Sequence, residues 1–348
     1  MNDARLVNLI QRRDFLKAGI ALGAAAAIPA SLARTAEASG STLLVGASFG
    51  DTGTRPVWPF WESPYILFSP HDAWDRVTAG TNVTVSVLVQ NGNQPATNVV
   101  ARFWWANPSL GIPPVNFIGT SAPADIAANS NALLVCTTPW VPVFVNGGHE
   151  CLIVELDCEQ GSPTYPFRPD LDPLVGQRNI TVLLPRLSHF PLQLANPFLE
   201  PGQTVITVST RFIRNAGRLI GQDFGMRPSD ILAHIDEPAA AAVARQLGLV
   251  VQQADPGTGV KLVNVEAANG SADGLDDATR AALRKVAGGA PSDGGRPIAS
   301  LDLPGLGVAT AALDIVPTAP KDAAVVHQIR QITDGVVIGG YDAILPPA

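Results

Sequence analysis

The stretch Asn82-Val83-Thr84-Val85-Ser86-Val87-Leu88-Val89-Gln90 decides the fold class. Its valines alternate with polar residues, so every second side chain can face a core while the others face water. Leu88 is the single break in this alternation, and Asn91-Gly92-Asn93 follows with the composition of a tight turn. This part of the chain therefore predicts a half-buried β-strand that ends in a turn.

Further strand patterns follow the first one along the chain. Residues 98–106 place Val99, Ala101, Phe103 and Trp105 on one side of an extended segment. Residues 132–135 and 151–156 supply more strands, and loops rich in Gly and Pro separate them. Short strands at this spacing, joined by such turns, predict an antiparallel β-sandwich.

A second β-rich region begins near residue 179. Residues 204–212 alternate as a half-buried strand does. Residues 325–333 and 336–345 flank Asp334-Gly335, a dipeptide suited to the type I′ turn of a β-hairpin. These patterns predict a second sandwich that closes with this hairpin.

The β pattern of the second region is interrupted at about residues 227–296. Within this stretch, residues 239–247 and 276–287 have the composition of helices, the latter with Asp276 or Asp277 as N-cap. The helices are short and offer little apolar surface for a core of their own. We therefore expect a partly helical insertion in the second sandwich.

Two of these segments resemble a known family. Residues 91–99, followed by Phe103-Trp104-Trp105, resemble the bacterial immunoglobulin-like modules of CARDB type over residues 60–185. The C-terminal hairpin is similar to the closing strands of a second such module. The resemblance implies a mainly β chain of two tandem immunoglobulin-like antiparallel β-sandwiches, residues 60–185 and 186–348, after an N-terminal extension at 39–59. It implies no activity.

The N-terminus carries an export pattern. Arg12 and Arg13, followed by Asp14, Phe15, Leu16 and Lys17, resemble a twin-arginine signal, and a weakly apolar run follows. Ala36 and Ala38 frame a small-x-small cleavage site. Residues 1–38 are therefore expected to be a signal peptide read by the twin-arginine export machinery, which delivers folded protein to the periplasm or the exterior. No other segment is long and apolar enough to predict a transmembrane helix.

Composition narrows the classes of partner. The chain has 348 residues, 46% of them hydrophobic, and a net charge of −7. Residues 1–38 hold five basic and three acidic residues, so the remaining chain has 18 basic and 27 acidic residues, a net charge of −9. This acidity argues against a nucleic-acid partner. The sequence contains neither nucleotide-binding glycine motifs nor paired metal-ligand spacings, so we expect no cofactor and no metal.

The three cysteines have two interpretations. Cys136 and Cys151, on neighbouring predicted strands, could form a disulfide in an exported protein, and Cys158 is an alternative partner for Cys136. Cys151 and Cys158 project to opposite faces of one strand. Alternatively, all three are small buried apolar residues. The sequence leaves this choice open.

Two short motifs suggest hydrolytic chemistry. Ser48 stands in a G-x-S-x-G pattern, and Asp51 opens the D-T-G-T pattern of aspartic proteases. The first chemistry needs a helix after the serine, and the second needs a partner carboxylate. Residues 51–56, which directly follow the serine motif, cannot start a good helix, and no second D-[ST]-G occurs after the signal peptide. A secreted hydrolase using Ser48 or Asp51 is therefore the alternative hypothesis.

All six tryptophans precede residue 141. Trp104 and Trp105 are adjacent and must face opposite ways in a strand, so an outward Trp104 beside Trp58 or Trp61 could form a platform for a sugar ring or a partner protein. Alternatively, these rings cover a sheet or cement an interface between domains. The sequence thus predicts an exported, non-catalytic binding or structural module of the cell envelope, with an unknown protein or polysaccharide ligand; a carbohydrate-binding module is the second alternative.

Overall fold

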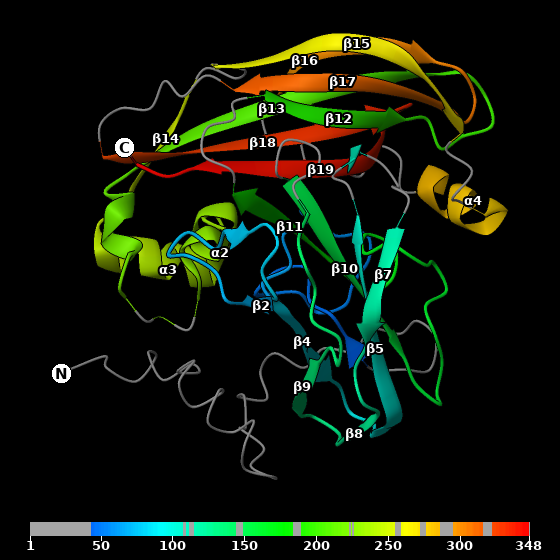
Figure 1. Cartoon of the computed structure of the whole chain (residues 1–348), viewed down its shortest axis with the longest axis vertical. Coiled ribbons are helices and arrows are strands. Elements are labelled where there is room, and N and C mark those ends of the chain that lie inside the picture. Colours follow the sequence, from blue (N-terminus) through cyan, green and yellow to red (C-terminus); the bar gives the residue numbers. More distant parts are fainter. Residues whose placement is uncertain are drawn as a thin grey trace.

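The part of the chain that the structure describes forms four β-sheets and a few short helices (Figure 1). A computed structural model describes residues 43–106, 109–110, 115–143, 149–183, 189–222, 224, 226–254, 259–271, 276–285, 295–315 and 322–347. Most strand pairs are antiparallel, and the sheets face one another in pairs around apolar cores. The mainly β fold class predicted from the sequence is confirmed.

Two sheets form the first sandwich. One contains β4 (Thr84–Asn91), paired antiparallel with β1 (Leu43–Leu44), β2 (Ile66–Ser69) and β9 (Asn131–Val135). The other runs in the order β3 (Val77–Thr78), β11 (Val175–Leu183), β10 (His149–Asp157), β5 (Ala96–Ala106) and β7 (Val115–Thr120), with β8 (Ala124–Ile126) also on β5. The pair β3–β11 is parallel.

The core of the first sandwich follows the alternation of the sequence. Val83, Val85, Val87 and Val89 are all inaccessible to solvent and meet side chains of the opposite sheet, such as Phe103. Burial of each valine side chain stabilises the folded state by about 1.5–3 kcal/mol relative to an exposed position. The predicted inward face of the stretch 82–90 is therefore confirmed.

The other two sheets form the second sandwich, which is drawn uppermost in Figure 1. One runs β15 (Val260–Ser271), β17 (Gly307–Ile315), β12 (His189–Ala195) and β6 (Ser109–Leu110). The other runs β14 (Val250–Gln253), β13 (Gly202–Arg214), β18 (Ala323–Thr333) and β19 (Val336–Leu345), with β16 (Arg296–Leu303) also on β13. Leu194, Ile206, Leu313 and Ile329 lie in the core between them.

The final hairpin has the predicted geometry. β18 and β19 pair antiparallel, and Asp334 and Gly335 connect them with φ angles of 49° and 77°. Two successive positive φ values define a type I′ turn, which Asp and Gly adopt at low cost. The hairpin prediction is confirmed.

Helices pack beside the second sandwich. η3 (Ala216–Leu219), α2 (Pro228–Ala233) and α3 (Pro238–Leu247) cover the outward side of β13 and β18, where Ile213 and Val326 lie. α4 (Asp277–Lys285) lies apart from them (Figure 1). The carboxylate of Asp276 accepts a hydrogen bond from the Thr279 amide at 2.7 Å, so it caps α4.

Strand pairing crosses three of the predicted boundaries. β6 lies within the predicted first sandwich, residues 60–185, yet it pairs with β12 of the second. β1 lies within the predicted extension 39–59, yet it pairs with β4 of the first sandwich. β15 and part of β16 lie within the predicted insertion 227–296, yet they pair with β17 and β13. The division of the chain into domains remains a prediction.

Candidate functional site

The junction between the sandwiches contains a buried aromatic contact. Trp61, fully buried, donates its indole Nε1–H to the Asp342 carboxylate on β19 at 3.0 Å. A side chain at Gly340 would overlap the indole ring, so glycine lets the two sandwiches approach closely. Phe60 and Val337 complete this apolar contact. The segment after β1 is therefore fixed against the last strand of the chain.

Arg178 is a buried cation in the same junction. It projects from β11, donates to the Ser63 carbonyl at 2.8 Å and forms an ion pair with Asp230 of α2 at 2.6 Å. Its second terminal nitrogen donates to Ser229 Oγ at 3.1 Å. One guanidinium thus joins the first sandwich to the helices that cover the second.

Arg227 precedes α2, and its side chain extends from the helical side of the junction to the first sandwich. It donates to the Ile66 carbonyl of β2 at 3.0 Å and to the Asp230 carboxylate at 2.9 Å. The guanidinium carbons of Arg178 and Arg227 lie 5.5 and 5.1 Å from the Phe68 ring centre, within cation–π range. The fork geometry of arginine suits such a shared carboxylate.

Asp230 stays ionised between these two arginines. Its burial alone would raise the carboxyl pKa, but Arg178 and Arg227 outweigh burial and lower the pKa to about 2. A buried ion pair of this kind is costly to break, because removing one partner leaves the other charge without compensation. This arrangement holds α2 against the first sandwich.

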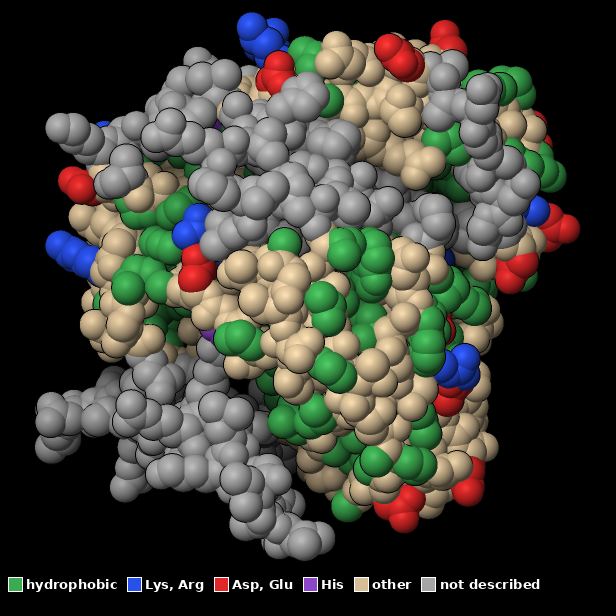
Figure 2. Space-filling view, viewed as in Figure 1, with side chains coloured by type: hydrophobic (Ala, Val, Ile, Leu, Met, Phe, Trp, Pro, Cys, Tyr) green, Lys and Arg blue, Asp and Glu red, His purple; other side chains and the backbone are tan. Residues whose placement is uncertain are grey.

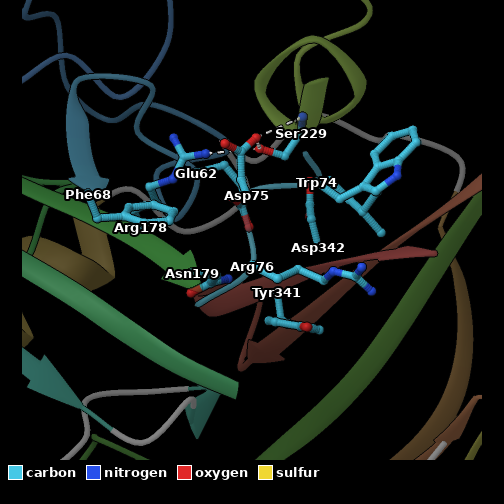
Figure 3. Close-up of a pocket in the computed structure, with 11 residues that line it drawn as sticks. Glu62, Phe68, Trp74, Asp75, Arg76, Arg178, Asn179, Ser229, Tyr341 and Asp342 are labelled. Atoms are coloured by element: carbon cyan, nitrogen blue, oxygen red, sulfur yellow. Dashed lines mark hydrogen bonds between the residues drawn. The ribbon is translucent and has the colours of Figure 1, made fainter. Parts of the chain in front are cut away.

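A small cavity of about 40 Å³ lies beside these groups (Figure 3). It can hold a few water molecules. On one side the Asp75 carboxylate accepts a hydrogen bond from Ser229 Oγ at 2.7 Å. Polar and aromatic groups of both sandwiches and α2 line it: Glu62, Phe68, Trp74, Asp75, Arg76, Arg178, Asn179, Ser229, Tyr341, Asp342 and Ile344.

Two carboxyl groups in this cavity have perturbed proton affinities. Burial, and secondly the charge of Asp342, raise the pKa of Glu62 well above its ordinary value, against the influence of Arg178. Burial also raises the pKa of Asp342, although the hydrogen bond from Trp61 opposes that shift. Both groups therefore hold protons more tightly than exposed carboxyls do.

His234, at the end of α2, is bonded through both ring nitrogens. Nε2 lies 2.8 Å from the Glu62 carbonyl and Nδ1 lies 2.7 Å from the Glu237 carboxylate. Burial would lower its pKa, but Glu237 and the Glu62 carbonyl outweigh burial and raise it. Both nitrogens face acceptors, so the imidazolium form fits this position best.

A second contact between the first sandwich and β19 lies next to α4. Arg168 is 1% exposed, pairs with Asp170 and donates to the Ile338 carbonyl of β19 at 3.2 Å. Leu283 of α4 packs with Ile338 in the same apolar cluster. The first sandwich is therefore attached to β19 at two separate places.

Ser48 and Asp51, the two residues of the hydrolase hypothesis, lie in a loop that is held by hydrogen bonds. The Asp51 carboxylate accepts hydrogen bonds from the amides of Ala47 at 2.7 Å and Gly53 at 2.8 Å, and it pairs with Arg55 at 3.1 Å. Ser48 is half-buried in the same turn. His234 lies near Phe49, but its Nε2 is directed to the Glu62 carbonyl. These contacts stabilise the loop and leave no serine–histidine pair there.

The predicted binding tryptophans lie in two separate places. Trp61 is fully buried at the junction, where the half-buried Trp58 packs with it. Trp104 is 8% exposed and contacts Phe117 and Phe167 edge to face. The structure thus brings Trp58 and Trp61 together but leaves Trp104 apart. Trp61 packs in the interface between the two sandwiches.

No disulfide joins Cys136, Cys151 and Cys158 in the structure. Cys136 lies in the core of the first sandwich, whereas Cys151 lies on the other face of β10. Cys158 is half-buried, and its thiol donates to the Gly161 carbonyl at 3.4 Å. The Cys136–Cys151 disulfide considered from the sequence is therefore absent, and burial raises the pKa of the Cys136 and Cys151 thiols. Buried apolar cysteines fit this arrangement.

The described residues contain neither a cluster of metal ligands nor a membrane-spanning helix. No group of three or more His, Cys, Asp or Glu side chains among them is placed to hold a metal ion. No helix in the described part of the chain is long and apolar enough to span a membrane. The predicted signal residues Arg12, Arg13, Phe15, Leu16 and Lys17, and the cleavage residues Ala36 and Ala38, lie outside the described ranges.

Comparison with known families identifies the N-terminal segment. The family of twin-arginine translocation pathway signal sequences matches residues 9–29. The chain therefore carries this export signal, as its paired arginines predicted. A comparison with curated proteins finds no match.

Two solved structures are similar to this chain. One is the CARDB domain of a Pyrococcus furiosus protein in complex with di-metal ions, at 13% identity and a TM-score of 0.23; the match covers 34% of this chain and 85% of that one. The other is the collagen adhesin of S. aureus, at 11% identity and a TM-score of 0.18, covering 80% and 90%. At such scores the matches carry no information on ligands.

Sequence reasoning missed the charged residues of the junction. Arg178, Arg227 and Asp230 look like ordinary surface charges when the sequence is read along the chain, because ion pairing across sheets leaves no local pattern. Pro228 just after Arg227 was the usable signal, since proline often opens a helix. Nothing in the local sequence could have paired Glu62 with Asp342.

Proposed function

We propose that this exported protein is a non-catalytic binding or structural module of the cell envelope. The junction carries the proposal: the buried side chains of Arg168, Arg178 and Arg227 each bond to a group on the far side of it, namely the Ile338 carbonyl, Ser229 Oγ and the Ile66 carbonyl. Such a junction suits a rigid spacer that presents fixed surfaces to a partner. Inter-domain contacts made only of weak polar groups would favour relative motion instead.

The surface supports a protein or polysaccharide partner rather than a charged polymer. In the view of Figure 2, described Lys, Arg, Asp and Glu side chains lie mostly at the periphery, and uncharged groups cover the middle of the first sandwich. Phe117 on the edge strand β7 is 60% exposed, and Leu199 is 59% exposed. Exposed aromatic residues are common anchors at protein interfaces, so we favour a protein partner that contacts Phe117.

The two alternatives have less support. The hydrolase hypothesis needs a free Asp51 or an activated Ser48, and the Asp51 carboxylate is occupied by loop amides and Arg55. The carbohydrate platform needs open tryptophan faces, and Trp61 and Trp104 are buried. Trp58, which is half-buried, is the remaining candidate for a sugar contact.

The test uses the full chain expressed with its own signal. A photo-crosslinking residue at position 117 should give a discrete protein adduct in the envelope fraction, and the same residue at the exposed position Thr84 is the matched control. Arg12→Lys/Arg13→Lys should retain the protein in the cytoplasm and abolish the adduct. Adducts equal at both positions, or none at position 117 in the exported protein, would overturn the proposed binding surface.

A companion assay separates the alternatives. Purified mature protein would be incubated with an ester and peptide library and, separately, with insoluble cell-wall polysaccharide. We expect no turnover and no co-sedimentation. Turnover lost in Ser48→Ala or Asp51→Asn would establish the hydrolase, and co-sedimentation lost in Trp58→Ala would establish the sugar-binding module.

A further inference from the structure

Glu62 and Asp342 reach one cavity from different parts of the fold (Figure 3). Glu62 belongs to the segment before β2 and forms a β-bridge with Arg178 of the first sandwich. Asp342 belongs to β19 of the second sandwich. The two residues are only 6% and 5% exposed. Two acidic side chains from the two sides of the junction thus share this cavity with a third, Asp75, which accepts the hydrogen bond from Ser229.

The positive charges around Glu62 are already engaged. Arg178 is the cation that favours its ionised form, and that guanidinium is paired with Asp230 at 2.6 Å. Asn179 offers Glu62 an uncharged hydrogen-bond partner, while Asp230 and Asp342 disfavour its negative charge. Cys151, a neighbour on β10, contributes no cation. Full ionisation of Glu62 is therefore poorly compensated.

Asp342 has partners of a similar kind. Trp61 and Gln328 donate to its two oxygens at 3.0 and 3.5 Å. His234 at the end of α2, Arg211 on β13 and Arg330 on β18 favour its ionised form, but burial outweighs them. Arg211 also pairs with Asp236. Arg76, which also lines the cavity, is paired with Asp72 at 2.7 Å. A second negative charge in this cavity would therefore meet Asp342 with little positive charge left to balance it.

We propose that Glu62 and Asp342 form a pH-sensitive latch between the sandwiches, closed while the pair holds at least one proton and loosened when both ionise. Two like charges in one poorly hydrated cavity repel strongly, and opening the junction would let each carboxylate reach water. The cavity of about 40 Å³ has room for water that can exchange protons without unfolding. The latch goes beyond the proposed binding function and does not depend on it.

The direction of the pH effect follows from the raised proton affinities. Burial raises the pKa of both Glu62 and Asp342 in the closed junction. Their contribution is complete at acidic pH, below the ordinary carboxyl pKa, and is lost as pH rises through the raised pKa values. The raised pKa of His234 acts in the same direction, so the test must change the carboxyls alone.

Hydrogen exchange read by mass spectrometry tests the latch. Peptides covering residues 60–64, 177–180 and 340–343 report on the junction, and a peptide covering residues 85–89 reports on a sandwich core. From about pH 6 to about pH 8.5, after correction for chemical exchange, junction protection in the wild type should fall roughly tenfold, the effect of one pKa unit. In Glu62→Gln/Asp342→Asn it should change less than about twofold, because neither amide ionises.

Glu150→Gln is the matched control. Glu150 is a fully buried acid of the first sandwich whose carboxylate accepts the Val143 amide at 3.1 Å, and burial raises its pKa to about 8. This variant should keep the wild-type loss of junction protection. The single variants Glu62→Gln and Asp342→Asn should each reduce that loss, which keeps the test valid if the double variant fails to fold. A wild-type profile in both single variants, or its abolition by Glu150→Gln, would overturn the latch.

Discussion

The indole of Trp61 donates a 3.0 Å hydrogen bond to the carboxylate of Asp342, although 281 positions separate the two residues in the chain. The contact joins the segment that follows the export signal to the last strand. Asp342 is carried by β19 of the second sandwich, so the contact depends on pairing between distant parts of the chain. Such non-local pairing is slow, which fits a protein exported by the route that carries folded cargo.

Substitution of Trp61 by Phe should weaken the junction. The change removes the indole N–H and leaves a buried Asp342 oxygen without its nearest donor. Loss of a partner to a buried polar group costs about 1–3 kcal/mol. Urea denaturation at neutral pH should therefore give a lower free energy of unfolding. A value within about 0.5 kcal/mol of the wild type would contradict this role of the hydrogen bond.

Gly340→Ala should disturb the same contact by sterics alone. The added methyl group would overlap the Trp61 ring, and overpacking of this kind typically costs about 1–3 kcal/mol. Gly217→Ala is the control, because a methyl group there meets nothing within 4 Å. Thermal denaturation should show a lower Tm for Gly340→Ala and little change for Gly217→Ala.

Asp230→Asn should be strongly destabilising. It removes the charge shared by Arg178 and Arg227, and leaving buried charges unpaired costs about 3–5 kcal/mol. The arginines lower the pKa of Asp230 to about 2, so its contribution is present above the ordinary carboxyl pKa and is lost as pH falls toward 2. The variant should therefore have a flatter stability profile between about pH 4 and pH 2.

Asp236→Asn provides the control for that experiment. Asp236 also pairs with an arginine, Arg211, but its side chain is 76% exposed. Exposed ion pairs contribute about 0–1 kcal/mol. Equal losses in urea denaturation for Asp230→Asn and Asp236→Asn would contradict the special role of the buried pair.

His327 should make the second sandwich sensitive to acid. It is 2% exposed and lies 3.0 Å from Thr210 Oγ1, and burial lowers its pKa from 6.5 to about 4. The unfolded chain binds this proton more readily, so stability is lost as pH falls from about 6.5 to about 4, by up to about 3 kcal/mol. His327→Gln should remove that loss in urea denaturation across this range. An unchanged pH profile in the variant would show that His327 does not carry it.

Asp51→Asn should lower stability by about 1.5–3 kcal/mol, because its charged carboxylate accepts two loop amides and pairs with Arg55. Ser48→Ala, in the same turn, should change stability by less than about 0.5 kcal/mol. Since we expect no turnover by the wild type, neither substitution should change catalytic activity. The measurement is urea denaturation of both variants beside the wild type. A larger loss of stability for Ser48→Ala than for Asp51→Asn would contradict the role of Asp51 in holding the loop.

Several elements were predictable because their cause is local. The alternation of Val83 to Val89 gave the buried face of β4, and Asp334-Gly335 gave the hairpin turn. The helix cap at Asp276 was legible for the same reason. α2 was missed because it is only six residues long and its apolar residues Ile231 and Leu232 pack against tertiary neighbours rather than repeat with a helical period.

The candidate site was much less predictable. Trp61 was identified as an oddity, but its role was left open between ligand platform and interface cement, since a buried and an exposed tryptophan have the same local sequence. Glu62 and Asp342 were not predicted as functional residues, because acidic side chains are ordinarily exposed. Only their enclosure in one cavity gives them an unusual chemistry.

The sequence by itself determined the export route, the mainly β fold and the strand faces, because paired arginines, period-two alternation and turn dipeptides act through neighbouring residues. The tertiary structure alone decided which charges are buried and which partners they meet. Trp61 reaches Asp342, and Arg178 reaches Asp230, through contacts between segments far apart in the chain. Burial and pairing depend on the packing of whole sheets, which no local pattern encodes.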